Sequence, residues 1–210
     1  MKIICTTSNR YLHLIQVFTY LFNKYMPGYK VTILGYQAPA SLPDNFTFHS
    51  MGEQGDVSEW STDIRKYVEG LDGWFIWFME DSFIRSFNES YFDTACAMMY
   101  PGIGRIDLTN DISKRPHVTA HGVRWAKPDT KYRLSTQPSI WNKEFLLNYL
   151  TPGLTPWQFE CLDAVNDNWH VVGMENAPMR VNEGVRKHDI YALDLNGFGN
   201  EDVAHIKTLL

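Results

Sequence analysis

The order of apolar and polar positions predicts that the chain opens with two strands joined by a helix. An apolar run at 2–6 indicates the first strand, and apolar residues at helical spacing over 12–22 indicate the helix, which a Pro-Gly pair ends. A second apolar run follows at 29–35. The result is a β-α-β unit with the usual right-handed crossover, an opening that is typical of nucleotide-binding α/β folds.

The most informative run is 73–83, where an unbroken apolar segment ends in two adjacent carboxylates, Glu80 and Asp81. Such aromatic-rich runs predict a strand covered on both faces. A helix predicted at 60–71, with Ser61 as its N-cap, leads into it. Because ligands of open α/β sheets bind outside the carboxyl ends of the strands, both carboxylates are expected to point into a ligand crevice. A turn or helix-capping pair is the alternative.

Shorter patterns predict the remaining elements. They are a strand at 46–49, a helix at 91–99, a strand at 104–108, an irregular hairpin within 114–130, a strand at 131–141, helices at 142–150 and from 155, a strand at 169–173 and a helix at 201–210. No repeat or linker divides them, so the predicted fold is α/β, one domain with a mixed, mostly parallel sheet flanked by helices.

Composition and charge narrow the class of protein. Hydrophobic residues make up 44% of the 210 residues and charged residues 20%, which is ordinary for a globular protein. The net charge of -5 and the lack of a Lys or Arg block argue against nucleic acid as the default partner. No segment predicts a signal peptide or a membrane span. The three cysteines, Cys5, Cys96 and Cys161, lack metal-type spacing and favour reduced thiols in a cytoplasmic protein.

Motifs of several enzyme classes are missing from the sequence. No Gly-x-Gly-x-x-Gly follows the first strand, which argues against a dinucleotide-dependent dehydrogenase. The histidines form no His-x-x-x-His or His-Glu-x-x-His pattern, so a zinc hydrolase lacks support. Gly-x-Ser-x-Gly is also absent, which disfavours serine nucleophile chemistry.

Four stretches carry a resemblance to a known family, and they occur in the family's order. They are Thr6-Thr7, the strand running into Glu80-Asp81-Ser82-Phe83, the Tyr-Arg-Leu-Ser-Thr-Gln-Pro-Ser-Ile-Trp segment at 132–141, and Pro156-Trp157-Gln158-Phe159-Glu160. Together they resemble small GT-A-like nucleotide-sugar glycosyltransferases of bacterial surface-polysaccharide and phage gene sets. The resemblance implies transfer of a sugar from a nucleotide diphosphate to an acceptor hydroxyl, assisted by a divalent metal. It also implies a nucleotide-binding half over about 1–110 and an acceptor and catalytic half over about 111–210.

The resemblance implies that Asp81 is the main ligand of a Mg²⁺ or Mn²⁺ ion, with Glu80 helping directly or through water. A divalent cation can neutralise the charge that forms on the departing diphosphate. Enzymes of this fold commonly carry Asp-x-Asp or Asp-Asp-x-Phe at the sheet edge, whereas this chain has Ser82 where a second Asp stands. Because such ions often use one or two protein carboxylates and the ligand's phosphates, the remaining pair is sufficient in principle.

The ends of the first two strands are candidates for donor binding. Thr6, Thr7 and Arg10 lie where the first strand gives way to the first helix, a position where backbone N–H groups and the helix dipole receive anions or base edges. Capping of the helix is an equally good explanation for this polar segment. Tyr36, after the second strand, is a candidate to stack on the base, with surface packing as its alternative.

Three further residues are candidates for acceptor binding, and one for general-base catalysis. Trp157 and Glu160 share a face of a predicted helix, so Glu160 is a candidate base and Trp157 a platform for a sugar ring. Their alternatives are a core tryptophan and a first-turn acid. Arg133 and Gln137 alternate with apolar neighbours on a predicted strand and are candidates to hold acceptor hydroxyls or a phosphate. A structural ion pair is the alternative for Arg133.

Two rival functions stay open at this level, and so does the stereochemistry of transfer. Phage glycosyltransferases of similar size decorate hydroxymethylated pyrimidines in DNA, and a groove for such a backbone would use scattered basic residues. These are Arg65, Lys66, Arg115, Arg124, Lys127 and Lys131. The other rival is a non-catalytic sugar- or nucleotide-binding module in which Glu80 and Asp81 only cap a turn.

Overall fold

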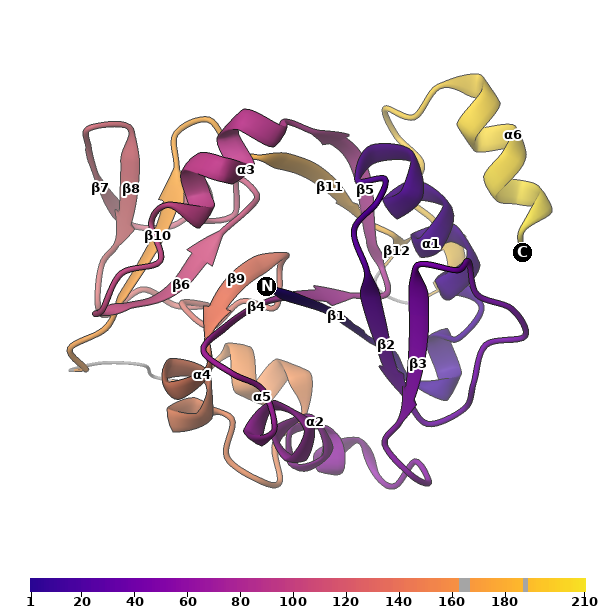
Figure 1. The fold of residues 1–210 in the computed structure, drawn as a ribbon, viewed down its shortest axis with the longest axis horizontal. Helices are drawn as coiled ribbons and strands as arrows, with labels where there is room; N and C mark the ends of the chain where they lie inside the picture. Colours follow the sequence, from indigo (N-terminus) through magenta and orange to yellow (C-terminus); the bar gives the residue numbers. More distant parts are fainter. Residues whose placement is uncertain (163–166, 187–188) are drawn as a thin grey trace.

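The computed structural model describes residues 1–162, 167–186 and 189–210, and it has a central β-sheet with helices on both faces (Figure 1). The sheet strands are β1 (Lys2–Thr6), β2 (Val31–Gly35), β3 (Phe46–Ser50), β4 (Trp74–Met79), β6 (Ile103–Asp107), β7 (His117–Ala120), β8 (Val123–Ala126), β9 (Ser139–Asn142) and β10 (His170–Met174). Their order across the sheet is β3-β2-β1-β4-β9-β6-β10-β8-β7.

Strand directions decide where a ligand site can form. The pairs β3-β2, β2-β1, β1-β4 and β6-β10 are parallel. Strand β9 runs antiparallel between β4 and β6, so β4 and β6 point the same way. The carboxyl ends of β1, β2, β4 and β6 therefore meet at one edge of the sheet. This edge is the ligand side of open α/β sheets, and it is where the sequence predicts the site.

The helices divide between the two faces of the sheet. They are α1 (Leu14–Tyr25), α2 (Trp60–Glu69), α3 (Glu89–Cys96), α4 (Lys143–Tyr149), α5 (Pro156–Glu160) and α6 (Asn200–Thr208), with 3-10 turns at Asn9–Tyr11, Val57–Glu59 and Ile112–Lys114. Helices α2, α4 and α5 lie together on one face, and α1 and α3 on the other (Figure 1). In the described part of the chain, no helix combines the length and apolarity needed to cross a bilayer.

Buried aromatic rings fix the short helix α5 against the sheet. Phe159 is fully buried, and its ring centroid lies 6.3 Å from those of Trp77 on β4 and Trp141 on β9, and 5.7 Å from that of Trp60 on α2. Thr155 caps the helix with a reciprocal capping box to Gln158, and Pro156 occupies the first helical position. These aromatic contacts position α5 and the carboxylate that ends it.

A second, two-stranded sheet extends the chain beyond the acidic turn. Directly after Glu80 and Asp81 the chain enters β5 (Ser82–Phe87), which pairs antiparallel with β11 (Met179–Glu183). A further pair joins β12 (Val185–Arg186) to β13 (Asp189–Leu193). The sequence patterns did not indicate these strands. The β5-β11 pairing places Glu183 opposite Ser82, next to the acidic turn.

The predicted α/β order is confirmed, with two local corrections. The first concerns 131–141, where only Ser139–Asn142 is strand and the preceding residues form turns. Tyr132 has a φ of 58°, and Ser135 N donates to Tyr132 O at 3.0 Å, which closes a turn and prevents strand pairing. Arg133 and Gln137 therefore do not share one face of a strand, and this prediction is wrong.

The second correction concerns Ser61, which does not cap α2. Ser61 is buried inside the helix, where its hydroxyl donates to Thr151 O at 2.7 Å and accepts from Leu154 N at 2.8 Å. A 3-10 turn precedes the helix, and Asp56 caps this turn by accepting a hydrogen bond from Ser58 N. Ser61 instead fixes α2 to the segment that leads into α5.

An ion pair between the exposed Lys24 on α1 and the buried Asp202 on α6 gives an expected pH dependence of stability. Burial would raise the pKa of Asp202, but hydrogen bonds from Lys24 and Tyr20 hold it below its ordinary value. An acid with a lowered pKa stabilises the native state above its unfolded pKa of about 3.9, and this contribution is lost as the pH falls through the folded value. We expect Asp202→Asn to lower the melting temperature at pH 7 and to have much less effect near pH 3.

Melting curves of the two proteins from pH 3 to 8 measure this difference. Glu201→Gln is the matched control, because Glu201 is the exposed neighbour on the same helix and should change little at any pH. An equal loss of melting temperature at pH 3 and pH 7 would show that Asp202 acts through packing alone.

Candidate functional site

The turn formed by Glu80 and Asp81 is fixed from two sides at the carboxyl edge of the sheet. Glu80 N donates to Thr6 O at 3.2 Å, which holds the turn against the end of β1. Asp81 O accepts hydrogen bonds from Phe83 N at 3.0 Å and from Gly184 N at 2.6 Å. The turn is therefore held by backbone contacts, and neither side chain serves as a helix cap there.

The carboxyl group of Glu80 is buried without a full set of partners. Glu80 is 4% exposed, and its Oε2 atom has no hydrogen-bond partner among the residues that the structure describes. Burial raises the pKa of Glu80 well above its ordinary value, and the charge of Asp81 raises it further. Buried polar atoms are nearly always paired, so an unpaired acid at a strand end is a candidate ligand-binding group.

Negative charges from three segments converge on Asp81. Burial raises the pKa of Asp81 to about 6, and the nearby carboxylates of Glu183 and Glu160 contribute to the rise. Glu183 ends β11 and Glu160 ends α5. Such a group of like charges favours the arrival of a cation or of hydrogen-bond donors.

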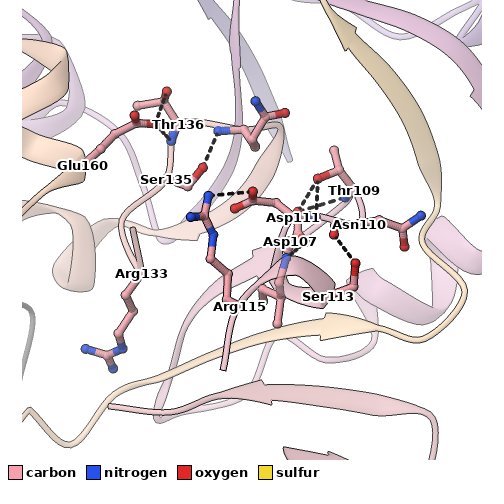
Figure 2. A network of polar contacts seen from close by, with 12 residues as sticks. Asp107, Thr109, Asn110, Asp111, Ser113, Arg115, Arg133, Ser135, Thr136 and Glu160 are labelled. Atoms are coloured by element: carbon pink, nitrogen blue, oxygen red, sulfur yellow. Dashed lines mark hydrogen bonds and ion pairs between the residues drawn. The ribbon is translucent and has the colours of Figure 1, made fainter. Parts of the chain in front are cut away.

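Thr136 holds Glu160 in a defined orientation. Glu160 Oε1 accepts hydrogen bonds from Thr136 N at 2.6 Å and from Thr136 Oγ1 at 2.7 Å, as Figure 2 shows. In the described chain no hydrogen bond to Glu160 Oε2 is found. One oxygen is thus fixed by two donors, and the other is available to accept a proton, which is the arrangement that a general base needs.

The threonines at the end of β1 have side chains that are engaged inside the protein. Thr6 Oγ1 accepts a hydrogen bond from Trp77 Nε1 at 3.0 Å and donates to Met79 Sδ at 3.1 Å. Thr7 N donates to Leu34 O at 2.9 Å, which extends the β1-β2 pairing by one residue. Both threonines are buried at the expected edge. They shape the end of β1, and the Thr6 hydroxyl is used by the core.

The other two donor-binding candidates lie near the same edge in different environments. Arg10 is exposed in the turn Asn9–Tyr11, with its guanidinium carbon 5.6 Å from the ring centroid of Tyr11. Tyr36 is partly buried and donates from its hydroxyl to Asp63 Oδ2 at 3.0 Å. Burial and this hydrogen bond raise the pKa of Tyr36. The hydroxyl of Tyr36 thus binds a side chain of α2, and its ring remains the group that could stack on a base.

The three acceptor-binding candidates lie in three different environments. Trp157 is 65% exposed on α5, so it is a surface residue and the core alternative is wrong. Gln137 follows Thr136, and its Nε2 donates to Glu183 Oε1 at 3.4 Å. Arg133 is 3% exposed, and its guanidinium binds Asp167 with two hydrogen bonds of 2.7 and 3.0 Å. Arg133 therefore has the structural ion pair that the sequence left open.

Most of the basic residues considered for a DNA groove already have protein partners. Lys66 pairs with Asp63, Arg65 with Glu69, Arg115 with Asp111, and Arg124 donates to Met174 O. They belong to separate elements, from α2 to β8. This distribution gives little support to a continuous phosphate-binding track.

Two residues of the site were not indicated by the sequence. Thr136 lies beside Gln137 in the resembling stretch, but its contact with Glu160 joins segments 24 residues apart. Glu183 lies on β11, whose short pattern predicts no strand. Both roles depend on contacts between distant segments, and no local pattern encodes them.

The carboxylates at this edge fit a cation only if a bound ligand supplies the rest of its coordination. The described residues contain no group of three or more His, Cys, Asp or Glu side chains that could hold a metal ion. The unpaired Oε2 of Glu80 and the like charges around Asp81 are nevertheless compatible with a cation that takes its other ligands from phosphate oxygens. Asp81 and Glu80 are the residues that would hold it.

Comparison with solved structures defines the fold class. A CMP:2-keto-3-deoxy-manno-octonic acid synthetase complexed with CTP matches with a TM-score of 0.51 and 11% identity, over 87% of this chain and 92% of the other. The galactosyltransferase LgtC, in complex with donor and acceptor sugar analogues, has a TM-score of 0.41 and 10% identity, over 70% of this chain and 60% of the other. A cytidylyltransferase from Leptospira borgpetersenii serovar Hardjo-bovis has a TM-score of 0.44 and 8% identity, over 76% and 67%.

The chain has the same fold as the synthetase, and the GT-A-like α/β fold predicted from the sequence is confirmed. At 11% identity the likeness to the synthetase extends to the fold alone. No protein-family model and no curated protein sequence matches the chain.

Proposed function

We propose that the protein is a glycosyltransferase that moves a sugar from a nucleotide-diphosphate sugar to an acceptor hydroxyl. The observation that carries the proposal is a set of contacts at the carboxyl edge of the sheet: Thr136 holds Glu160, and the adjacent Gln137 donates to Glu183, which pairs opposite Ser82 beside Asp81. Two carboxylates with different environments can divide the work of stabilising the leaving group and activating the nucleophile. The fold supports a nucleotide ligand, because the matching synthetase was determined with CTP.

The donor nucleotide is proposed to lie over the ends of β1 and β2, beside Thr6, Thr7, Arg10 and Tyr36. Its diphosphate would face Asp81 and Glu80, and a bound Mg²⁺ or Mn²⁺ would neutralise negative charge there. The polar segment that follows β1 is the natural place for anion contacts, since backbone N–H groups are available before the helix is formed.

On the acceptor side, Glu160 Oε2 is proposed to take the proton of the attacking hydroxyl. The acceptor oxygen forms a bond to the anomeric carbon, and the bond from this carbon to the diphosphate breaks, so that the nucleoside diphosphate leaves with the electron pair. Trp157, exposed one helical turn before Glu160, offers a flat face for the acceptor ring. Gln137 offers an amide beside it.

A general base in this position suits a single displacement, which inverts the anomeric centre, whereas a retaining enzyme has no equal need for it. The anomeric configuration of the product, read by NMR, distinguishes the two. A carbohydrate acceptor is favoured over a modified DNA base because the basic residues are mostly paired with protein groups. The division into halves at about residue 110 and a cytoplasmic location stay predictions from the sequence.

A thermal-shift panel tests the proposal. Nucleoside diphosphates, nucleotide sugars and nucleoside triphosphates are each added with and without Mn²⁺. A ligand that binds only the folded state at 100 times its Kd adds about 2.7 kcal/mol, so at least one nucleotide sugar should raise the melting temperature by about 5 °C or more. Unphosphorylated nucleosides are the control.

Two results would contradict the proposal. One is that no nucleotide shifts the melting temperature under any condition. The other is that only triphosphates do so and that pyrophosphate is released when a sugar acid is added, which would indicate nucleotidyl transfer. Release of a free nucleoside diphosphate together with a glycosylated product supports it.

A further inference from the structure

A polar pocket of about 460 Å³ lies beside the candidate site, between the loop that follows β6 and the wall formed by β5 and β11. Asn110, Asp111 and Lys114 line it from the loop, and Arg180, Asn182 and Glu183 line it from β11. Sequence patterns had not singled out the loop residues.

The loop side of the pocket is built rigidly by Asp107 at the end of β6. Asp107 Oδ1 accepts hydrogen bonds from Thr109 N at 2.9 Å and Thr109 Oγ1 at 2.7 Å, and Asp107 Oδ2 accepts from Ile112 N at 3.1 Å (Figure 2). Asp107 is 1% exposed. These bonds order the loop before any ligand arrives, so the positions of Asn110 and Asp111 are preorganised.

Asp111 lines this pocket and carries a buried acceptor without a partner among the described residues. The residue is 5% exposed, and its Oδ1 accepts from Arg115 Nη2 at 2.9 Å. Its Oδ2 is buried and has no hydrogen-bond partner among the described residues. Arg85 also lines the pocket, and its Nε atom is a buried donor that has no hydrogen-bond partner among the described residues. Each unpaired group carries a desolvation cost that a ligand with both donors and acceptors removes.

The charges of the lining identify the chemistry of the ligand. Three cationic side chains are balanced by three anionic ones, namely Arg85, Lys114 and Arg180 against Asp111, Glu183 and Asp194. A phosphate would satisfy only the donors, and a metal ion only the acceptors. Hydroxyl groups both donate and accept, so a polyhydroxylated ligand of no net charge fits this lining best.

The pocket is continuous with the proposed catalytic site through two residues. Gln137 lines the pocket and directly follows Thr136, which holds Glu160. Glu183 also lines the pocket, accepts a hydrogen bond from Gln137 Nε2 at 3.4 Å, and acts by its charge on Asp81. Two residues of the lining thus connect the pocket to the segment that holds the proposed base and to the acidic turn.

We propose that this pocket is a subsite of the acceptor, separate from the face of Trp157, which does not line it, and that it takes an uncharged sugar unit whose hydroxyl groups bind the Asp111 carboxylate and the Asn110 amide. The acceptor role of the pocket rests on the proposed function. The binding of a sugar in the pocket does not, and it can be measured without any reaction. It adds Asn110 and Asp111 to the residues that select the substrate.

The test measures the binding of methyl glycosides of glucose, galactose, mannose and their N-acetylamino analogues by ligand-observed NMR. We expect the intact protein to bind at least one of them, Asp111→Asn to weaken the Kd at least about tenfold, and Asn110→Ala to weaken it severalfold. Asp93→Asn on α3 and Asn148→Ala on α4 are matched exposed controls and should bind as the intact protein does.

The nucleotide that gives the largest thermal shift is titrated into the same variants, and it separates this inference from the proposed function. Loss of sugar binding in both pocket variants, with nucleotide binding retained, supports the inference. If no glycoside binds, or if the pocket variants bind glycosides as well as the controls, the inference is overturned. If sugar binding depends on Asp111 but no nucleotide binds, the pocket is a sugar site and the proposed transferase function fails.

Discussion

Glu160→Gln is expected to lower kcat for sugar transfer by about 10²- to 10⁴-fold, because an amide cannot accept the proton of the attacking hydroxyl. The substitution preserves shape, and the amide oxygen can still accept the two hydrogen bonds from Thr136 that hold the side chain. Folding and donor binding should therefore change little. Initial rates of nucleoside diphosphate release with acceptor present measure the effect.

Glu144→Gln is the control for the base, since Glu144 is an exposed acid in the first turn of α4 and contacts no part of the site. It should retain the full rate. A Glu160→Gln protein that turns over as fast as the control would eliminate Glu160 as the base. If the product also retained the anomeric configuration of the donor, a different mechanism of transfer would follow.

Asp81→Asn is expected to reduce the rate of transfer by about 10²- to 10³-fold, because it removes the charge that holds the diphosphate and its cation in place. The same substitution should raise the melting temperature of the ligand-free protein at pH 8. The pKa of Asp81 is raised to about 6. An acid with a raised pKa makes the native state less stable as the pH rises from about 4 to 6, and above that range the full cost is present.

A lower rate of transfer together with a higher melting temperature distinguishes a functional carboxylate from a structural one. Asp72→Asn, at the exposed start of the same strand segment, should alter neither the rate nor the melting temperature. Melting curves and initial rates with saturating Mn²⁺ measure both quantities on the same preparations. An Asp81→Asn protein with an unchanged rate would remove the proposed diphosphate site.

Much of the central sheet can be predicted from the sequence because its signals are local. The apolar run that ends at Met79 has the length of one strand, and the carboxylates after it lie at the strand end because they interrupt the apolar run. Likewise, Thr155 and Pro156 begin α5 through capping and a fixed backbone angle, which neighbouring residues determine.

The failure over 131–138 has a physical cause in the tertiary structure. Arg133, Leu134 and Ser135 are 3%, 0% and 3% exposed, so three consecutive residues are buried and no face of a strand alternates there. Polar and apolar residues alternate in the sequence here, but the polar Arg133 is buried as well, because its guanidinium pairs with Asp167. Burial of a paired charge cannot be inferred from a hydrophobic pattern.

The β5-β11 pairing was missed for a different reason. Its strands carry mixed polar and apolar residues, and they are far apart in the sequence. Pairings of this kind are decided by the surfaces that they cover, and local propensity contributes little. The carboxylate of Glu183 therefore enters the site without a signal in its own neighbourhood.

The hydrogen bond from Gly184 N to Asp81 O also constrains the order of assembly during synthesis. The strand that secures the turn, β11, is synthesised long after the turn itself. Closing so long a loop is among the slower steps of folding, since its entropy is lost before the contacts form. A nascent chain can thus build most of its sheet while the two carboxylates still lack their fixed geometry, and this geometry should be completed late.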